Sequence, residues 1–439
     1  MCRLLADNGH EVRLAVKSLG ETKPHGFDIM LNSDANLATL AEWADVIVVQ
    51  GLVLLFHPVL KLAQKHLVVD IYDPFNLEIL ELLHDAPWDE RLEHHYGHLG
   101  ALVDQLNAGD FFLCASHKQR DYWLGALSTA GRINPYTHGE DRQLRRLIDV
   151  APFGIDPRPP IHSGKPAAKG VLPGIGKDDR LLIWGGGVYN WFDPLSLLRA
   201  WPRVLDRVPN ARLLFMGLQH PNPDVPAMAM ATRAIQLSEE LGLRDKSVHF
   251  NLEWVPYERR KDFLLESEIG VSMHFEHLET AFSFRTRILD YIWAGIPIVA
   301  TEGDEFARWI QSEGAGRVAR YEDAGSIADA ITELLTNREA YLACSRAVEG
   351  ARSPFAWEET LKPLVRYCAQ PWHAADLVAA KSPKGRRQSQ ELLNSALAPR
   401  ALGPKMLFFL RREGPASLVR RMYRALLRRV PRGWLASDS

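Results

Sequence analysis

Short apolar runs alternate with longer amphipathic stretches along most of the chain. The runs, such as ADVIVV at 44–49 and LVVDI at 67–71, are rich in β-branched residues and apolar on both faces. This is typical of strands buried inside a parallel sheet. The stretches between them repeat apolar residues at the three- and four-residue spacing of helices. The alternation predicts an α/β fold in which helices cover both faces of parallel sheets.

The first group of elements predicts a Rossmann-like domain over residues 1–155. Residues 4–8 are expected to form the last turns of a helix that ends at Gly9, and the strand EVRLAVK at 11–17 follows. A helix in first place suggests that the first strand of the sheet is missing. The further strands are expected at 44–49, 67–71, 111–115 and 147–151.

A second group of the same kind predicts another doubly wound domain over residues 179–352. Residues 156–178, between the two groups, are rich in Pro, Gly and Lys without periodicity, so we expect a linker there. A closing helix within 353–373 and a basic tail over 374–439 are expected to follow. The second group's strands are expected at 181–184, 211–216, 248–251, 269–273, 298–300 and 316–319, with helices at 194–207, 227–241, 258–266, 326–336 and 338–345.

The stretch richest in candidate chemistry is HFEHLETAFSFRTRILDYIWAGIPIVAT, at 274–301. It is expected to begin as a loop that carries Glu279 and to enter a helix at Ser283, a good N-cap. Backbone N–H groups and the helix dipole favour an anion in the first turns of such a helix. Either the stretch binds a phosphorylated, hydroxyl-rich ligand, or it is an ordinary loop–helix–strand connection with a solvated charged face. The charged residues in those turns are Arg285, Arg287 and Asp290.

A glycine-rich turn is the second candidate site. Gly185, Gly186 and Gly187 leave the strand at 181–184, and consecutive glycines let a backbone approach a diphosphate closely. Asn190 and Trp191 follow in the same loop and are expected to contact the same ligand. A tight turn that binds nothing is the alternative.

Residues at other strand ends are further candidates. Tyr72 and Asp73 follow the strand at 67–71 and are expected to face a cleft, where they contact an acceptor or a transferred sugar unless they only form a turn. Trp254 follows the strand at 248–251 and either stacks on a nucleobase or packs in the core.

Composition sets the class of protein and reveals one asymmetry. The length of 439 residues suits two or three domains. The four cysteines have no metal-ligand spacing, which favours reduced thiols, an intracellular setting and no structural zinc. No apolar run reaches the roughly 18 residues of a membrane helix. The net charge is −2, although residues 375–439 carry 14 Lys and Arg against 4 Asp and Glu, so an acidic body carries a basic tail.

Several motifs resemble glycosyltransferase family 4. They are GHEV at 9–12, PFGID at 152–156, VPY at 255–257, and Asp290 followed by AGIPIVAT at 294–301. The resemblance covers roughly residues 1–370. It implies a GT-B fold, in which two Rossmann-like domains face each other, and a retaining transferase that uses a nucleotide sugar and no essential metal. It also implies that the closing helix with Phe355 and Trp357 crosses back onto the first domain.

The chain departs from the family's pattern at two points. The family has two glutamates eight residues apart, the second holding ribose hydroxyls; Asp290 stands at the second position and Phe282 at the first. The nearest acid is Glu279, expected to reach the sugar only through a longer loop. The family's basic pair on the diphosphate is also absent. We expect Arg285 and Arg287, with the amides of the glycine turn, to take its place, unless either arginine forms a salt bridge to a nearby glutamate.

The resulting prediction is a metal-independent hexosyl- or deoxyhexosyltransferase without a cofactor. Its expected partners are a nucleotide-sugar donor and a saccharide or lipid-linked saccharide acceptor of a cell-envelope or surface polysaccharide, with no nucleic acid. A catalytically inactive binding or scaffold protein and a nucleotide-sugar epimerase of the same fold are the alternatives. The expected catalytic residues are Glu279, Arg285, Arg287 and Asp73, and the expected donor contacts are Gly185, Gly186, Gly187, Asn190, Trp191, Trp254, Ser283, Arg285, Arg287 and Asp290, with no metal ligand.

The tail suggests where the protein works. Residues 405–432 place arginines beside Leu, Met, Phe and Tyr, a pattern that suits an interfacial helix on anionic lipid. Packing of these helices on the protein's own acidic body is the alternative. The prediction is a cytoplasmic protein with peripheral contact at the inner face of the cell membrane.

Overall fold

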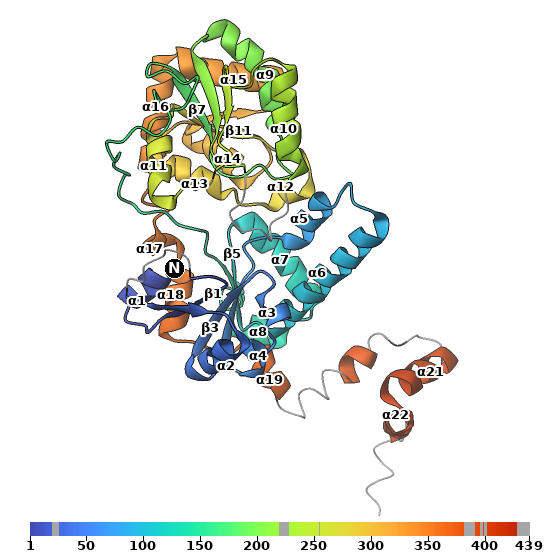
Figure 1. Cartoon of the computed structure of the whole chain (residues 1–439). Helices are drawn as coiled ribbons and strands as arrows, with labels where there is room; N and C mark the ends of the chain where they lie inside the picture. Colours follow the sequence, from blue (N-terminus) through green and yellow to red (C-terminus); the bar gives the residue numbers. More distant parts are fainter. Residues whose placement is uncertain are drawn as a thin grey trace, which may run out of the picture. The chain divides into compact units, whose positions relative to one another are not determined.

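The computed structural model describes residues 1–19, 26–218, 228–253, 255–381, 391–395, 398 and 402–427. It divides into two units, Met1–Ala374 and Ala375–Ser439 (Figure 1). The first unit contains two α/β domains, and the described residues of the second form mainly helices. None of the described helices has the length and apolar character that a membrane crossing needs.

The first domain is built on a four-stranded parallel sheet in the order β3-β4-β5-β6. Its strands are apolar and largely buried, as the sequence predicts. The strand β1 was expected to join this sheet, but it pairs with the unpredicted strand β2 in a separate two-stranded parallel sheet. The domain contains α1 (Cys2–Asp7), β1 (Arg13–Val16), β2 (Asp28–Leu31), α2 (Asp34–Trp43), β3 (Val46–Gln50), α3 (Val53–Phe56), α4 (Val59–Leu62), β4 (His66–Asp70), α5 (Phe75–Leu82), α6 (Trp88–Ala108), β5 (Phe111–Cys114), α7 (His117–Thr129), α8 (Pro135–Glu140) and β6 (Ile148–Val150).

The second domain is a doubly wound sheet of six parallel strands in the order β9-β8-β7-β10-β11-β12. The strand order reverses between β7 and β10, and ligands of such sheets bind at the carboxyl ends of the strands beside this switch point. The domain contains β7 (Arg180–Trp184), α9 (Pro194–Arg207), β8 (Ala211–Phe215), α10 (Ala229–Glu240), β9 (Val248–Phe250), α11 (Tyr257–Leu265), β10 (Ile269–Ser272), α12 (Leu278–Phe282), α13 (Thr286–Ala294), β11 (Ile298–Thr301), α14 (Glu305–Glu313), β12 (Gly316–Ala319), α15 (Ala324–Thr336) and α16 (Arg338–Gly350).

Successive side chains of β7 pack into two different cores, because neighbouring residues of a strand point to opposite faces of the sheet. Leu182 and Trp184 lie in the core on one face, and Leu181 and Ile183 lie in the core on the other. Both faces are therefore covered, which explains why the strand is apolar from Leu181 to Trp184.

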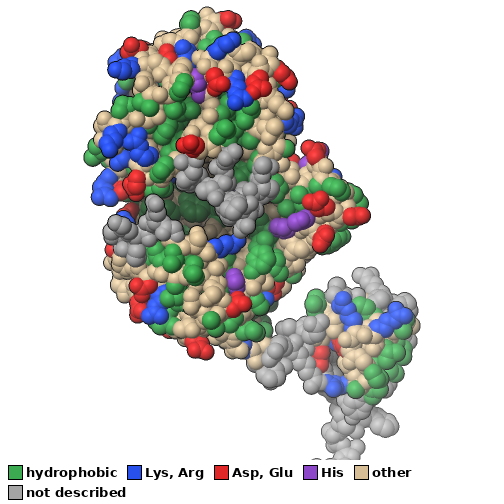
Figure 2. Space-filling view, viewed as in Figure 1, with side chains coloured by type: hydrophobic (Ala, Val, Ile, Leu, Met, Phe, Trp, Pro, Cys, Tyr) green, Lys and Arg blue, Asp and Glu red, His purple; other side chains and the backbone are tan. Residues whose placement is uncertain are grey.

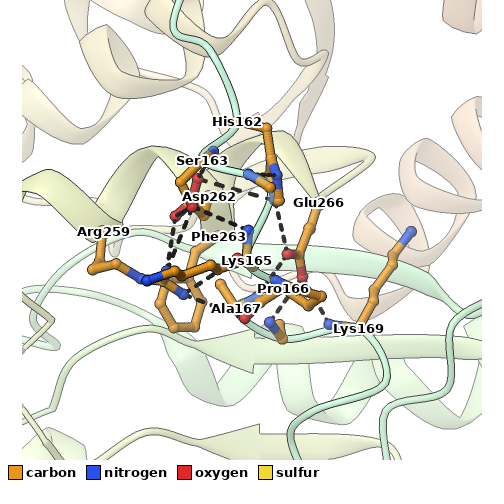
Figure 3. A network of polar contacts seen from close by, with 12 residues as sticks. His162, Ser163, Lys165, Pro166, Ala167, Lys169, Arg259, Asp262, Phe263 and Glu266 are labelled. Atoms are coloured by element: carbon orange, nitrogen blue, oxygen red, sulfur yellow. Dashed lines mark hydrogen bonds and ion pairs between the residues drawn. The ribbon is translucent and has the colours of Figure 1, made fainter.

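The segment between the two domains is fixed to α11 rather than free. The Glu266 carboxylate accepts the backbone N–H groups of Ala167, Ala168 and Lys169 at 2.7, 2.8 and 2.8 Å (Figure 3). Asp262 accepts both the N–H and the hydroxyl of Ser163 at 2.8 and 2.7 Å. The absence of periodicity correctly indicated irregular structure here, but it could not indicate this anchoring.

The closing segment returns to the first domain as two helices instead of the single one expected. Pro363 lies in the first turn of α18 (Lys362–Ala369), directly after α17 (Trp357–Thr360), and its missing N–H suits a helix start. Leu361, Leu364 and Tyr367 pack in the first domain's core with Phe111 of β5.

The second unit contains α19 (Ala375–Lys381), a helical turn over 391–395, α21 (Leu402–Glu413) and α22 (Pro415–Leu427). The half-buried Glu413 carboxylate holds these last three segments together. It accepts from Arg421 at 2.8 Å, from the Ser417 hydroxyl at 2.5 Å and from the Asn394 amide at 2.7 Å. Part of the tail predicted over 405–432 lies outside the described residues.

The packing of Tyr291 on β10 gives a stability prediction. A Cβ atom at Gly270 would lie 2.4 Å from the Tyr291 ring, so Gly270→Ala overpacks the core and should lower the free energy of unfolding by about 1–3 kcal/mol. Urea denaturation measures the loss. Gly350→Ala, where a Cβ meets nothing within 4 Å, is the control and should cost no more than a few tenths of a kcal/mol. Equal midpoints for the two variants would contradict the prediction.

Candidate active site

A cavity of about 1010 Å³ lies between the two domains of the first unit, at the carboxyl ends of β4 and β7. Figure 2 shows a recess between these domains. The first domain contributes Tyr72, Asp73, Glu78 and Phe153, and the second contributes, among others, Gly185, Gly186, Gly187, Tyr189, Trp191, Tyr257, Arg260, Ser283, Arg285, Arg287, Asp290 and Trp293.

Two side chains of α13 hold the glycine turn at both ends. The Tyr291 hydroxyl accepts the N–H of Gly185 at 2.8 Å, and Arg287 Nη2 donates to the carbonyl of Gly187 at 2.8 Å. Residues four apart lie on the same face of a helix, so one face of α13 grips the whole turn. Gly186 has a φ of +92°, which favours glycine. Within the described chain, the N–H groups of Gly186 and Gly187 have no acceptor.

Arg287 is a buried positive charge without a carboxylate partner among the described residues. Its side chain lies over the rings of Trp184 and Phe192, with the guanidinium carbon 4.7 and 4.3 Å from the ring centres. Only 9% of the residue is exposed, and Nη1 has no hydrogen-bond partner. Burial lowers the pKa of the guanidinium to about 10, so it remains charged at neutral pH. The arrangement is suited to an anion.

Arg285 differs because its charge is already neutralised. Its Nη1 and Nη2 atoms lie 2.7 and 2.5 Å from the two carboxylate oxygens of Glu279, which is 1% exposed. This is the alternative that the sequence left open. Glu279 does not line the cavity, so the expected contact with the sugar is not supported.

Two local predictions around these residues are wrong. Glu279 lies in the first turn of α12, capped by His277, and not in a loop. Ser283 follows α12 and donates to the carbonyl of Thr280 at 3.1 Å, whereas α13 begins at Thr286 without a side-chain cap. The uncapped end leaves the first N–H groups of α13 unpaired by any side chain, next to the cavity-lining residue Thr286.

Asp290 lines the cavity and forms an ion pair with Arg260 of α11, with oxygen–nitrogen distances of 3.0 and 3.1 Å. Burial raises the pKa of Asp290 to about 6. Arg260 lies over the ring of Tyr257 at 4.2 Å, and Trp293 flanks it at 5.6 Å. This end of the cavity therefore combines a carboxylate with aromatic and guanidinium planes.

Asp73 lines the cavity from the first domain, as expected, and Glu78 of α5 hydrogen-bonds to it. Burial raises the pKa of both carboxyl groups, and it raises that of the neighbouring Asp70 to about 7. Glu78 was not predicted from the sequence, because it lies five residues beyond Asp73 and reaches the cavity only through the packing of α5.

The remaining candidates divide into those at the cavity and those away from it. Trp191 lines the cavity and stacks on Tyr189 with ring centres 5.0 Å apart. Asn190 does not line it; its amide donates to the carbonyl of Leu82 at 3.4 Å and accepts from the N–H of Met230 at 3.2 Å. Trp254 lies outside the described residues.

Phe282, which stands where the family has an acid, is a contact between the two domains. Its ring lies 4.8 Å from that of Tyr122 in α7. Its carbonyl accepts from the Gln119 amide at 2.9 Å, and the same amide nitrogen donates to the carbonyl of Tyr72 at 2.6 Å. Gln119 is fully buried, so it joins α12 directly to the loop that carries Asp73.

Comparison with known proteins identifies the class of the second domain. Residues 179–337 match the family model described as glycosyl transferases group 1. D-inositol 3-phosphate glycosyltransferase of Mycolicibacterium smegmatis is 25% identical over 250 residues, which cover 54% of this chain and 52% of that protein. The match thus spans about half the length of this relative.

Solved structures identify the fold of the first unit. HepE of Anabaena, in complex with UDP and glucose, superposes with a TM-score of 0.56 and 12% identity, covering 84% of this chain and 95% of HepE. WaaG, a glycosyltransferase involved in lipopolysaccharide biosynthesis, superposes with a TM-score of 0.56 and 14% identity, covering 84% of this chain and 94% of WaaG. Sucrose-phosphate synthase of Thermosynechococcus elongatus superposes with a TM-score of 0.56 and 14% identity, covering 84% of this chain and 92% of the synthase. The chain has the GT-B fold, which confirms the prediction.

The pair of Arg285 and Glu279 gives a second stability prediction. Arg285→Met should lower the free energy of unfolding by about 3–5 kcal/mol, because it leaves the Glu279 carboxylate buried without a partner. Urea denaturation measures this loss. The double variant with Glu279→Met should recover most of it. Arg308→Met, which removes an exposed pair with Glu305, is the control and should cost about 1 kcal/mol or less. A single Arg285 variant as stable as this control would show that the buried pair is not needed.

Proposed function

We propose that this protein is a retaining glycosyltransferase of the family 4 type, which moves a hexosyl or deoxyhexosyl group from a nucleotide sugar to a cell-envelope or surface saccharide or glycolipid. The observation that carries the proposal is the buried, unpaired Arg287 beside the free amides of Gly186 and Gly187. The family match of the second domain and the relative from Mycolicibacterium support the activity. HepE, which binds UDP and glucose, supports a nucleotide-sugar donor.

In this proposal the diphosphate of the donor binds at the glycine turn. The N–H groups of Gly186 and Gly187 point to no other acceptor within the described chain, and Arg287 adds a full positive charge next to them. The uncapped start of α13 contributes further N–H groups and the positive end of its dipole. Arg287 thereby replaces the basic pair that the family has in the glycine-rich loop. Arg285 acts through its pair with Glu279 instead of as a free cation.

In this proposal the nucleoside binds beside the diphosphate, where Asp290 and Arg260 form their ion pair. In the family the equivalent carboxylate holds ribose hydroxyls, and Asp290 lines the cavity with its oxygens 3.0 and 3.1 Å from Arg260. The carboxylate accepts hydrogen bonds from the ribose only while it is ionised, which its raised pKa of about 6 allows at neutral pH. The rings of Tyr257 and Trp293 flank this region.

The transfer depends on electrostatic stabilisation of the leaving group. The bond between the sugar's anomeric carbon and the diphosphate oxygen breaks, and the bond to the acceptor oxygen forms. The negative charge that develops on the diphosphate lies between Arg287 and the glycine amides, which are fixed before the reaction by Tyr291 and therefore need little reorganisation. The departing diphosphate takes up the acceptor's proton. The positive charge comes from the protein, so the proposal includes no metal ion and no cofactor.

The donor site gives the central prediction. Arg287→Ala should weaken nucleotide-sugar binding about 10- to 100-fold, because hydrogen bonds to charged groups contribute about 1.5–3 kcal/mol each. Calorimetry with the donor that stabilises the wild type most, chosen by thermal shift from UDP-, GDP-, dTDP- and ADP-sugars, measures the loss. Tyr291→Phe removes a turn anchor but keeps the charge, so it should bind more tightly than Arg287→Ala.

Two outcomes would overturn the assignment. Unchanged affinity in Arg287→Ala would show that the diphosphate lies elsewhere. A wild-type protein that binds none of the four donors, and hydrolyses none of them without acceptor, would favour the inactive scaffold protein. That alternative has one structural observation behind it: Phe282 stands in place of an acid and serves as an interdomain contact.

The exposed side chains of the second unit support a proposed contact with anionic lipid at the inner face of the cell membrane. Its helices α21 and α22 expose Leu407, Leu410, Val419 and Met422, each more than 40% accessible. The exposed Lys405 and Arg411 lie on the same helix as the first two. Apolar side chains beside basic ones suit the boundary between acyl chains and anionic headgroups. A lipid-linked acceptor would be met at this surface.

Vesicle binding tests the membrane contact. In the full chain, Lys405→Gln with Arg411→Gln should weaken binding to phosphatidylglycerol vesicles about 30-fold, since each basic residue contributes about 1 kcal/mol. Co-sedimentation measures the partition. Arg338→Gln with Arg346→Gln makes the same charge change on α16, where both residues are exposed, and should have no effect. Equal losses for the two double variants, or no binding by the wild type, would contradict the contact.

A further inference from the structure

The first domain presents two carboxyl groups to the cavity. Asp73 lies in the loop after β4, directly before Pro74, and Glu78 lies in the first turn of α5. The two side chains hydrogen-bond to each other, and neither has a basic partner among the described residues of the first domain. Two carboxyl groups that hydrogen-bond to each other share one proton, because both cannot carry a charge at low cost.

The groups that face this pair come from every element around it. Glu279 of α12 and Arg285 lie across the cleft, close enough to act on both carboxyl groups. Tyr72 lies beside them in the first domain, and burial, together with the charges of Asp73 and Glu78, raises the pKa of Tyr189 in the glycine loop. Asp70 of β4 also acts on Tyr72. The pair therefore lies close to Arg285, which lines the same cavity as Arg287.

Unpaired donors in the same cavity point to a ligand independently of the carboxyl pair. Arg285 Nε and Arg287 Nη1 have no hydrogen-bond partner, although the two residues are only 6% and 9% exposed. Buried donors of this kind cost free energy unless a ligand satisfies them. Both residues line the cavity with Asp73 and Glu78.

The charges select the chemistry of the ligand between these groups. An anionic ligand group would be repelled by the carboxyl pair, and a cationic one would be repelled by the arginines. A neutral group with several hydroxyls satisfies both sides, because each hydroxyl donates and accepts, as does a carboxyl pair that shares a proton. We propose that Asp73 and Glu78 bind the hydroxyl groups of the transferred sugar and that the site selects a neutral sugar. This inference rests on the proposed donor site.

The proposal also accounts for Phe282. The family's acid at this position is replaced by an aromatic residue that joins the two domains, so the second domain offers no carboxylate there. Gln119 bonds to the carbonyls of Phe282 and Tyr72 and thereby fixes the loop of Asp73 against α12. A carboxyl pair from the first domain takes over the contact that the second domain lacks.

Binding of UDP-glucose and of UDP to the full chain tests the pair. In Glu78→Ala, the ratio of UDP-glucose to UDP affinity should fall about tenfold, while the affinity for UDP stays unchanged. Glu78→Gln keeps a donor and an acceptor and should retain most of the ratio. Glu81→Ala on the same helix, which does not line the cavity, is the control and should leave both affinities unchanged. UDP-glucuronate, which carries a carboxylate, should bind the wild type less tightly than UDP-glucose.

The outcomes separate the two proposals. If the wild type binds neither UDP nor UDP-glucose, and GDP-mannose and GDP also fail, the donor site itself is wrong. If UDP binds and the ratio is the same in Glu78→Ala and in Asp73→Asn as in the wild type, the donor site stands and the carboxyl pair does not bind the sugar. Unchanged thermal midpoints show that the variants are folded.

Discussion

The grip of α13 on the glycine turn is the interaction on which the proposed site depends. Tyr291 and Arg287, one helical turn apart, bond to the first and last glycines of the turn. Both ends are fixed by side chains of a buried helix, so the middle of the turn presents its N–H groups in a set direction. Gly270 in β10 leaves the space that the Tyr291 ring occupies. The position of the turn is thus determined by packing in the core and not by the loop itself.

The same grip leaves a positive charge in the interior. Arg287 uses one nitrogen to hold the turn and is stacked on two aromatic rings, but no carboxylate within the described chain balances it. Burying such a charge is costly, and the lowered pKa of about 10 expresses that cost. Arg285 shows the contrast, because Glu279 neutralises it in a bidentate pair. The charge of Arg285 is therefore neutralised within the protein, whereas that of Arg287 remains available to a ligand.

The sequence predicted most of the fold but only part of the site. Buried parallel strands are apolar throughout, so β3 to β12 were recognisable, whereas β2, with its exposed ends, was not. Arg287 and the glycine turn were predicted from local patterns. The pairing of Glu279 with Arg285 was left open as an alternative, because it depends on a bend at Ser283 between α12 and α13 that the expected single helix did not include. Glu78 reaches the cavity through tertiary packing, which no local pattern encodes.

The charged groups follow one another along the cavity in an order that matches a nucleotide sugar. Asp290 and Arg260 form an ion pair, and Arg287 is close enough to both Asp290 and Arg285 for their charges to act on it. Arg285 in turn acts on Asp73 and Glu78. The groups are thus a carboxylate beside aromatic rings, then an excess positive charge, then a carboxyl pair. In the proposed complex these groups face the ribose, the diphosphate and a neutral sugar, and only the diphosphate requires net charge from the protein.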